Sequence, residues 1–324
     1  MEELNKQEWN YNPTVPIENN PAFTFPLIFK KIFKWYANMW APLSETVFCL
    51  FVGIIYFLLH PPIILFENLN FNSILTIYLF NITIMIVIAG GLHLFFYTLK
   101  KQNNHLKYDD RIVSKSKKFT FNYQILDNMF WSLTSGVTIW TFYQILILWS
   151  YANGFIKQIN FNINPFWFLA IFFLIILFES VHFYFVHRLL HFKYFYKFIH
   201  HIHHRNINPG PWSGISMHPI EHIFYFSTVL IHFFIPSHPI HILFHFMIIT
   251  IGAVVGHCGF DSIIINKKNK LALGHFHHQL HHRYFECNYG TIETPLDVWF
   301  KSFHDGTSAA TKSMRTKRRK IHNI

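Results

Sequence analysis

The sequence predicts an all-α integral membrane protein with about four transmembrane helices, a re-entrant or interfacial hairpin and a cytosolic helical metal domain. Three observations lead to this prediction. Of the 324 residues, 52% are hydrophobic, 19% aromatic and only 13% charged, a balance typical of membrane proteins. Several apolar windows are long enough to cross a bilayer as helices. Three groups of histidines recur at helical spacing in the second half of the chain.

The N-terminal segment, residues 1–44, is expected to be cytosolic or interfacial. Residues 1–25 are polar, with acidic residues at Glu2 and Glu3, and lack the basic start and apolar core of a secretory signal peptide. Residues 26–44 place lysines among aromatic residues, which is typical of a short helix at the membrane surface. A solvated linker is the alternative.

Residues 45–164 are interpreted as a transmembrane region with a basic cytosolic loop. A bilayer core of about 30 Å needs about 20 apolar residues in a helix. The windows of this length are 45–66, 73–98, 128–150 and 165–186. The 99–127 loop carries seven Lys and Arg residues, whereas 151–164 carries only Lys157. The positive-inside rule therefore makes the 99–127 loop cytosolic, and counting crossings places the chain from about His187 onward on the same side.

The three histidine groups are HRLLH at 187–191, HHIHH at 200–204 and HHQLHH at 277–282. On a helix, side chains three and four residues apart share a face, so each group can present imidazoles to one point. Such a lining suits iron, zinc or copper. The candidate metal-binding and catalytic residues are His187, His191, His200, His203, His204, His278, His281 and His282.

Other classes of site find little support in the sequence. The motif His-Glu-x-x-His is absent, and Glu179 to His182 is a single Glu-x-x-His pattern, whereas ferritin-like sites need two. Cys49, Cys258 and Cys287 form no C-x-x-C pair. The net charge is +11, and the basic residues that produce it flank apolar spans. They therefore indicate the orientation of the protein in a membrane rather than nucleic-acid binding.

Two further segments are expected to depart from simple spans. Residues 223–256 are apolar but contain Pro236 and Pro239, which interrupt a helix. They predict a re-entrant or interfacial hairpin; two tilted crossings are the alternative, and both keep the third histidine group cytosolic. The basic tail, residues 307–324, is expected to be solvated and disordered, with attraction to anionic headgroups as an extra role.

The order H-x3-H, H-x2-H-H, H-x2-H-H resembles the fatty acid hydroxylase and sterol desaturase superfamily of membrane-bound, metal-dependent oxygenases. The surrounding residues agree with this resemblance: HPIEH at 218–222, HCGFD at 257–261 and NYGTIETPLDVWF at 288–300. The resemblance covers roughly residues 165–306, which we interpret as the catalytic domain.

The resemblance implies two iron ions, dioxygen and electrons from an external donor such as cytochrome b5 or a ferredoxin-type protein. Zinc is possible in isolated protein, because nitrogen sites bind it more tightly than iron(II). His257 matches a family position that completes the metal site, and His218 and His222 are less certain ligands. Carboxylates expected to orient the imidazoles are Glu221, Asp261, Asp297 and Asp305.

Other histidines are not expected to be ligands. His201, His275 and His277 fall off the shared spacing, and those of the hairpin are expected to be interfacial or packed: His232, His238, His241 and His245.

The expected function is oxidation of a C–H bond in a lipid, by hydroxylation or desaturation, with a sterol or related lipid ahead of a fatty acid or alkylglycerol. The competing class is a non-enzymatic membrane metal-binding or transport protein, which would use irregular histidine spacing. The expected location is the endoplasmic reticulum membrane in a eukaryote or the inner membrane in a bacterium.

Overall fold

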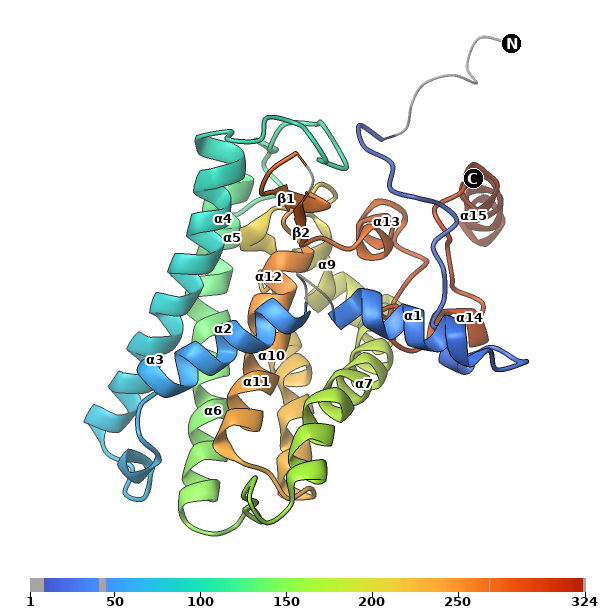
Figure 1. Ribbon diagram of the computed structural model, residues 1–324. Coiled ribbons are helices and arrows are strands. Elements are labelled where there is room, and N and C mark those ends of the chain that lie inside the picture. Colours follow the sequence, from blue (N-terminus) through green and yellow to red (C-terminus); the bar gives the residue numbers. More distant parts are fainter. Residues whose placement is uncertain (1–8, 41–44, 268, 323–324) are drawn as a thin grey trace, which may run out of the picture.

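The computed structural model describes residues 9–40, 45–267 and 269–322. These residues form a bundle of long helices with a histidine-rich helical region at one end (Figure 1). The all-α membrane fold class is therefore confirmed. The predicted acidic start at Glu2 and Glu3, and residues 41–44 of the N-terminal segment, lie outside the described residues.

Three of the described helices are long and apolar enough to cross a membrane. They are Phe71–Thr98, Pro165–Leu190 and Pro239–Gly256. The second is the continuous helix α7, whereas the others contain π-helical turns. The first comprises α3 (Phe71–Met85), η4 (Ile86–Gly90), α4 (Gly91–His93) and η5 (Leu94–Thr98), and the third α11 (Pro239–Met247), η10 (Ile248–Gly252) and α12 (Ala253–Gly256).

Two of the predicted spans differ from this set. The window 45–66 forms the shorter helix α2 (Glu45–Leu58) and the 3-10 turn η3 (Ile63–Phe66), because two prolines at 61 and 62 stop the helix. The window 128–150 lies in an unbroken helical run that carries more polar side chains and is not among the three apolar spans. That run consists of α5 (Gln124–Trp131), η6 (Ser132–Gly136) and α6 (Val137–Ala152).

Residues 223–256 form a helical hairpin, and its second arm, Pro239–Gly256, is long and apolar enough to cross a membrane. Whether the hairpin re-enters or crosses the membrane stays a prediction. Its first arm comprises α10 (Pro219–Phe226) and η9 (Ser227–Phe233), and α11 begins the second arm. Pro239 occupies the first turn of α11, where it costs no backbone hydrogen bond, and the His238 side chain accepts from the Ile240 amide. The first arm begins at the histidine end of the bundle, and the second arm returns to it (Figure 1).

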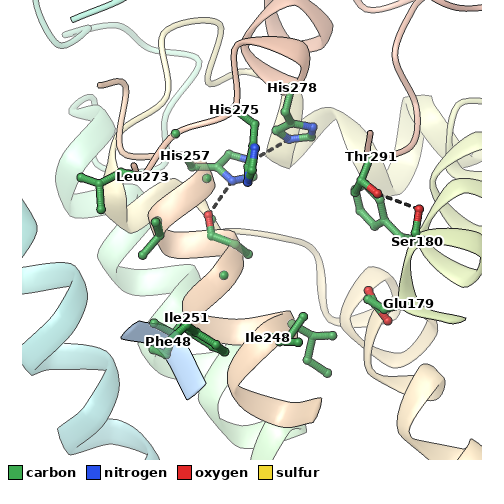
Figure 2. A pocket seen from close by; sticks show the side chains of 18 of the residues that line it. Phe48, Glu179, Ser180, Ile248, Ile251, His257, Leu273, His275, His278 and Thr291 are labelled. Carbon is green, nitrogen blue, oxygen red and sulfur yellow. Dashed lines mark hydrogen bonds between the residues drawn. The ribbon is translucent and has the colours of Figure 1, made fainter. Parts of the chain in front are cut away.

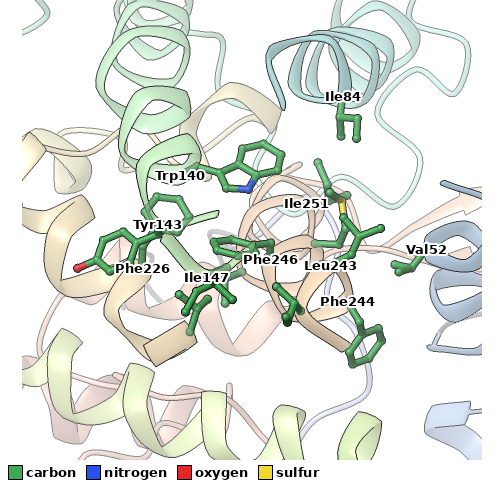
Figure 3. Close-up of a cluster of buried hydrophobic side chains, with 14 of the residues drawn as sticks. Val52, Ile84, Trp140, Tyr143, Ile147, Phe226, Leu243, Phe244, Phe246 and Ile251 are labelled. Atoms are coloured by element: carbon green, nitrogen blue, oxygen red, sulfur yellow. The ribbon is translucent and has the colours of Figure 1, made fainter. Parts of the chain in front are cut away.

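The hydrophobic core lies where α6, α10 and α11 meet, with α2 and α3 packed beside them. Trp140 and Ile147 from α6 contact Phe226, Leu243 and Phe246 from the hairpin, all of them fully buried (Figure 3). Because α11 is mostly apolar and its two histidines, His241 and His245, are hydrogen-bonded, it can occupy the centre of the bundle. This packing fixes the hairpin that carries His257 at its end.

The histidine end is built from short elements. After α7 come α8 (Lys193–Phe195), η7 (Tyr196–His200), α9 (His201–His204) and η8 (Pro211–Ser213); after α12 come β1 (Ser262–Ile264), β2 (Lys270–Ala272), α13 (Phe276–Tyr284) and α14 (Leu296–Trp299). The antiparallel pair β1 and β2 was not expected from the sequence.

Both chain ends contain more helix than a solvated chain would. The N-terminal segment forms η2 (Pro21–Phe23) and the amphipathic helix α1 (Phe29–Trp40). The tail was expected to be disordered, but it forms α15 (Ser308–His322). The Thr307 hydroxyl accepts from the Ala310 amide at 3.2 Å, and buried Met314 packs in a cluster with Trp9 and Phe276. Capping and apolar burial therefore offset the repulsion between its basic residues.

The basic 99–127 loop packs against the histidine region. Lys118 Nζ donates to the Arg205 carbonyl at 2.8 Å, and Arg205 forms an ion pair with buried Asp127 at 2.6 Å. Arg283 pairs with Asp109 of the same loop at 2.6 Å. The loop and the histidines therefore lie on one face of the protein.

Candidate metal centre

The structure brings all nine predicted imidazoles, His257 included, into two adjoining groups, and within each group the potential ligand atoms lie within 4.8 Å of one another. The group of five comprises His187, His191, His200, His204 and His281. The group of four comprises His203, His257, His278 and His282. That these residues hold metal stays a prediction.

The histidines reach the two groups because neighbouring residues on one helix point to different groups. His203 and His204 are consecutive in α9, and His281 and His282 are consecutive in α13. Consecutive residues on a helix diverge by about 100°, so α9 and α13 each contribute to both groups. His187 comes from the last turn of α7.

The distances between ring nitrogens fit coordination of a metal ion. In the group of five, His204 Nε2 lies 3.1 Å from His191 Nε2 and 3.0 Å from His281 Nε2. In the group of four, His257 Nε2 lies 3.0 Å from His282 Nε2 and 2.9 Å from His278 Nε2. A metal–nitrogen bond of about 2.0–2.1 Å gives an octahedral edge of about 2.9 Å, so the spacing suits several nitrogens around one ion.

Four of the imidazoles are fixed in one tautomer by backbone carbonyls. The Nδ1 atoms of these rings lie 2.6–3.0 Å from carbonyl oxygens. The pairs are His187 with Tyr289, His257 with Ala253, His281 with Cys287 and His282 with Asn206. Because a carbonyl can only accept, each Nδ1 carries the hydrogen and each Nε2 presents a lone pair.

This tautomer leaves nitrogen lone pairs facing each other, an arrangement that a bound cation would stabilise. The Nε2 atoms of His257 and His282 lie 3.0 Å apart, and each directs a lone pair at the other because its ring carries the hydrogen on Nδ1. Protonation would relieve their repulsion, but burial lowers the pKa of His257 to about 4 and that of His282 well below its usual value. A metal ion relieves it without adding a proton, so the donor set fits a metal.

One carboxylate orients an imidazole of the group of five. His200 Nδ1 lies 2.7 Å from Glu221 Oε1, and both side chains are buried. Burial raises the pKa of Glu221 well above its usual value and lowers that of His200. Such a partner fixes the ring and strengthens it as a ligand, as the sequence predicted for Glu221.

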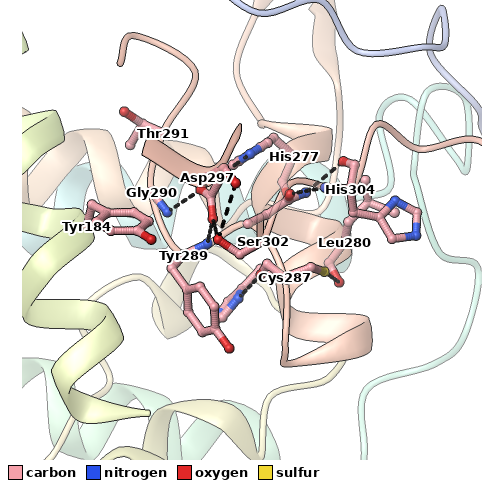
Figure 4. Close-up of polar contacts among 12 residues, drawn as sticks. Tyr184, His277, Leu280, Cys287, Tyr289, Gly290, Thr291, Asp297, Ser302 and His304 are labelled. Atoms are coloured by element: carbon pink, nitrogen blue, oxygen red, sulfur yellow. Dashed lines mark hydrogen bonds and ion pairs between the residues drawn. The ribbon is translucent and has the colours of Figure 1, made fainter. Parts of the chain in front are cut away.

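The other predicted carboxylates play different parts. Asp261 accepts from Tyr108 and Ser262, and Asp305 accepts from Thr307, so neither contacts a ligand imidazole. Asp297 accepts from the amides of Tyr289 and Gly290 at 2.9 and 2.8 Å and from Ser302 at 2.6 Å (Figure 4). It thereby positions the Tyr289 carbonyl that binds His187.

The two less certain ligands lie outside both groups. His218 caps α10 and stacks on Trp131. His222 is buried with Nε2 3.0 Å from the Ile215 carbonyl and Nδ1 3.3 Å from Ser135 Oγ. Both rings are therefore engaged in packing and local hydrogen bonds.

The remaining histidines also lie outside the groups. His201 is exposed, as its off-spacing position suggests. His232, His241 and His245 in the hairpin are fully buried and hydrogen-bonded. The hairpin rings are packed, which is one of the two roles expected for them.

A large apolar cavity adjoins both histidine groups. Its volume is about 670 Å³, within the range of about 300–1,000 Å³ typical of ligand pockets. His257 and His278 lie at one end, and Phe48, Ile248 and Ile251 line the part farther along the bundle (Figure 2). The cavity can hold a lipid with one part against the imidazoles.

The sequence could not reveal which backbone carbonyls bind the imidazoles. The carbonyl of Asn206 and that of Cys287 follow the second and third histidine groups by two and five residues. Every residue has a backbone carbonyl, so the amino-acid sequence does not indicate which of them accepts a hydrogen bond from an imidazole. The NYG segment at 288–290 was quoted for its resemblance, and its Tyr289 carbonyl is one of these partners.

The comparisons with known proteins agree with this geometry. Residues 172–302, which contain all nine imidazoles, match the fatty acid hydroxylase family. The matched family and the curated sterol desaturases and methylsterol oxidase support the fatty acid hydroxylase and sterol desaturase superfamily for the histidine-box region. The predicted resemblance is thus confirmed.

Several curated relatives of this superfamily act on sterols according to their names. The chain is 35% identical over 132 residues to a Delta(7)-sterol 5(6)-desaturase of Gibberella zeae and 30% identical over 167 residues to another of Aspergillus fumigatus. It is 32% identical over 135 residues to a C-4 methylsterol oxidase of Schizosaccharomyces pombe.

These matches involve only part of each protein. They cover 40%, 43% and 39% of this chain and 40%, 52% and 43% of the relatives, so the chain spans about half of their length or less. No solved structure matches the chain significantly.

Proposed function

We propose that the protein is a membrane-bound oxidoreductase that oxidises a C–H bond of a lipid, with a sterol or related lipid as the substrate. The observation that carries this proposal is the junction of two imidazole groups with a cavity of about 670 Å³. An apolar cavity of this size suits the body of a lipid. The sterol enzymes among the relatives support the choice of lipid.

The group of five and the group of four would each hold one iron ion. The ions, when bound, supply the activation of dioxygen with electrons from an external donor. Imidazole is a suitable ligand for iron, and neutral rings add no negative charge to the site. Zinc binds such nitrogen sites more tightly than iron(II), so it is a possible occupant of isolated protein.

The protein's own residues orient the reaction. The apolar wall formed by Phe48, Ile248 and Ile251 binds the hydrocarbon body and excludes water from the cavity. The carbonyls and Glu221 hold five of the nine rings through Nδ1, so that the Nε2 atoms of these five point inward. The placement of the bound carbon relative to the imidazoles then decides between hydroxylation and desaturation.

The histidine face is proposed to be cytosolic. It shares one side of the protein with the basic 99–127 loop, through the contacts of Lys118 and Arg205, and basic loops favour the cytosol. A cytochrome b5 or ferredoxin-type donor is proposed to dock there, guided by charge. The membrane is that of the endoplasmic reticulum in a eukaryote or the inner membrane in a bacterium.

A metal carrier is the competing function, and the site geometry disfavours it. A carrier must release its ion, whereas these imidazoles come from four separate segments and are fixed by buried hydrogen bonds. Such a fixed set of donors suits a resident ion.

The test compares the lipids of cells with and without the protein by mass spectrometry under labelled dioxygen. A sterol that gains one labelled oxygen or loses two hydrogens is the expected product. His282→Ala should abolish it, because only three imidazoles then remain in the group of four. His201→Ala is the matched control, since His201 is exposed on the same face and belongs to neither group.

Two outcomes would contradict the proposal. If His282→Ala formed the same product in the same amount, the imidazole groups would not be the site of the reaction. A product found only among fatty acids or ether lipids would replace the sterol with the alternative substrate class.

A further inference from the structure

An acidic side chain lines the cavity at a point where no metal-binding role explains it. Glu179 lies in α7, inside a helix apolar enough to span the membrane, and is only 9% exposed. Ionisable residues in such segments are costly and usually functional. The histidine chemistry does not use Glu179, which belongs to neither imidazole group.

The surroundings of Glu179 form a built polar site. Glu179 Oε2 lies 3.7 Å from His245 Nε2. His245 is held in turn by Thr228 at 3.2 Å and by His232 at 3.2 Å, and His232 contacts Ser237 at 2.7 Å. This buried chain fixes His245, so the carboxyl group has a rigid support behind it.

Two other polar side chains of the cavity wall, Glu221 and Tyr225, are already engaged, and two more lie beside Glu179. Glu221 binds His200 and the Tyr225 hydroxyl donates to a backbone carbonyl. Ser180, the next residue in α7, lies 2.7 Å from the Thr291 hydroxyl (Figure 2). Glu179, Ser180 and Thr291 therefore make one polar patch in an otherwise apolar wall.

The charges along the cavity select the kind of polar group that fits. Glu179, Glu221 and Glu293 line it, and among the described residues no Lys or Arg does. A carboxylate or phosphate headgroup placed beside Glu179, away from the imidazole groups, would find no Lys or Arg among these described lining residues. A hydroxyl group, which can donate to a carboxyl oxygen, suits the patch.

We propose that Glu179 accepts a hydrogen bond from the hydroxyl group of the lipid substrate and so positions a hydroxylated lipid of the sterol type in the cavity. This inference rests on the proposed lipid oxidation. It adds a specificity-determining residue and excludes free fatty acids as the preferred ligand.

The spacing along α7 also predicts which part of the lipid reacts. Glu179 precedes His187 by eight residues, which is about 12 Å along the helix, and helical side chains lean toward the N-terminus. Both side chains lean the same way, so the His187 ring stays about 12 Å from the Glu179 carboxyl group along the helix axis. The carbon that faces the imidazoles is therefore expected about 12 Å from the hydroxyl group.

The experiment measures equilibrium binding to the full-length protein in lipid nanodiscs, so that it does not depend on turnover. The ligands are a Δ7-unsaturated 3-hydroxysterol, its 3-methyl ether and the hydrocarbon without the oxygen. The hydroxysterol should bind roughly 10- to 100-fold more tightly than the other two, because only it can donate to Glu179.

Variants separate recognition from folding. Glu179→Leu should bind all three ligands alike, and Glu179→Gln, which keeps an acceptor oxygen, should keep most of the preference. Glu67→Gln is the control, because Glu67 is exposed in the loop before α3. If Glu179→Leu fails to fold, the wild-type preference for the hydroxysterol over its methyl ether still decides the question.

The outcomes distinguish this inference from the proposed function. Equal binding of the hydroxysterol and its methyl ether, or a preference unchanged in folded Glu179→Leu, would overturn the role of Glu179 and leave lipid oxidation standing. Binding of none of the three ligands would overturn both the hydroxyl contact and the sterol substrate.

Discussion

The contact between Glu221 and His200 predicts that metal can be lost from one imidazole group alone. Glu221 touches a ring of the group of five and none of the group of four. Replacing it by Leu leaves a buried Nδ1–H without its acceptor. Replacing it by Gln keeps an acceptor oxygen in the place of the carboxyl group.

The size of the effect follows from the buried geometry. The His200 Nδ1 to Glu221 Oε1 distance is 2.7 Å, with both side chains no more than 2% exposed. Loss of such an outer partner typically lowers metal affinity about 10- to 100-fold, or about 1.4–2.7 kcal/mol. We expect the lower end for Glu221→Gln and the upper end for Glu221→Leu.

The assay is metal content per chain after dialysis against buffers of fixed free metal concentration, with affinity from chelator competition. Wild-type protein and the exposed-site control Glu67→Gln should retain two ions. The Glu221 variants should fall toward one ion as free metal decreases. Retention of both ions at wild-type affinity, or equal loss of both, would refute the assignment of Glu221 to one group.

Two further predictions concern sidedness and packing. In sealed membranes, a membrane-impermeant maleimide should label Lys117→Cys only from the cytosolic side and Asn162→Cys only from the opposite side. The unsubstituted chain gives the background labelling. Labelling of both variants from the same side would contradict the proposed orientation. Gly214→Ala should lower the free energy of unfolding by about 1–3 kcal/mol, because its Cβ would lie 2.6 Å from the Ala253 backbone of α12. Thermal unfolding checks this against Gly53→Ala, where a Cβ meets nothing within 4 Å, and equal stability of the two variants would contradict the close packing.

Helical spacing was sufficient to select imidazoles that the fold brings together. His200, His203 and His204 share a short helical segment, and spacing alone predicted that they gather. It could not predict that His203 and His204 serve different groups, because that depends on the packing of α13 beside α9. Their role as ligands stays a prediction.

Other features had weaker signals. The strands β1 and β2 each contain three residues, too few for an alternating pattern to emerge. In the described residues, four π-helical segments interrupt the long helices and a fifth, η7, lies between α8 and α9. Such one-residue irregularities depend on tertiary contacts. The two prolines at 61 and 62 did indicate that α2 ends early. The prediction of a span over 45–66 followed the apolar length of the window instead.

The origin of the imidazoles has a consequence for how the protein matures. Both groups need a residue of α13, since His281 completes one and His282 the other. If each group holds an ion as proposed, the ribosome must translate almost the entire matched region before either group is complete. Loading is then a late checkpoint, and a polypeptide truncated ahead of α13 would expose unmetallated imidazoles to the cell's degradation machinery.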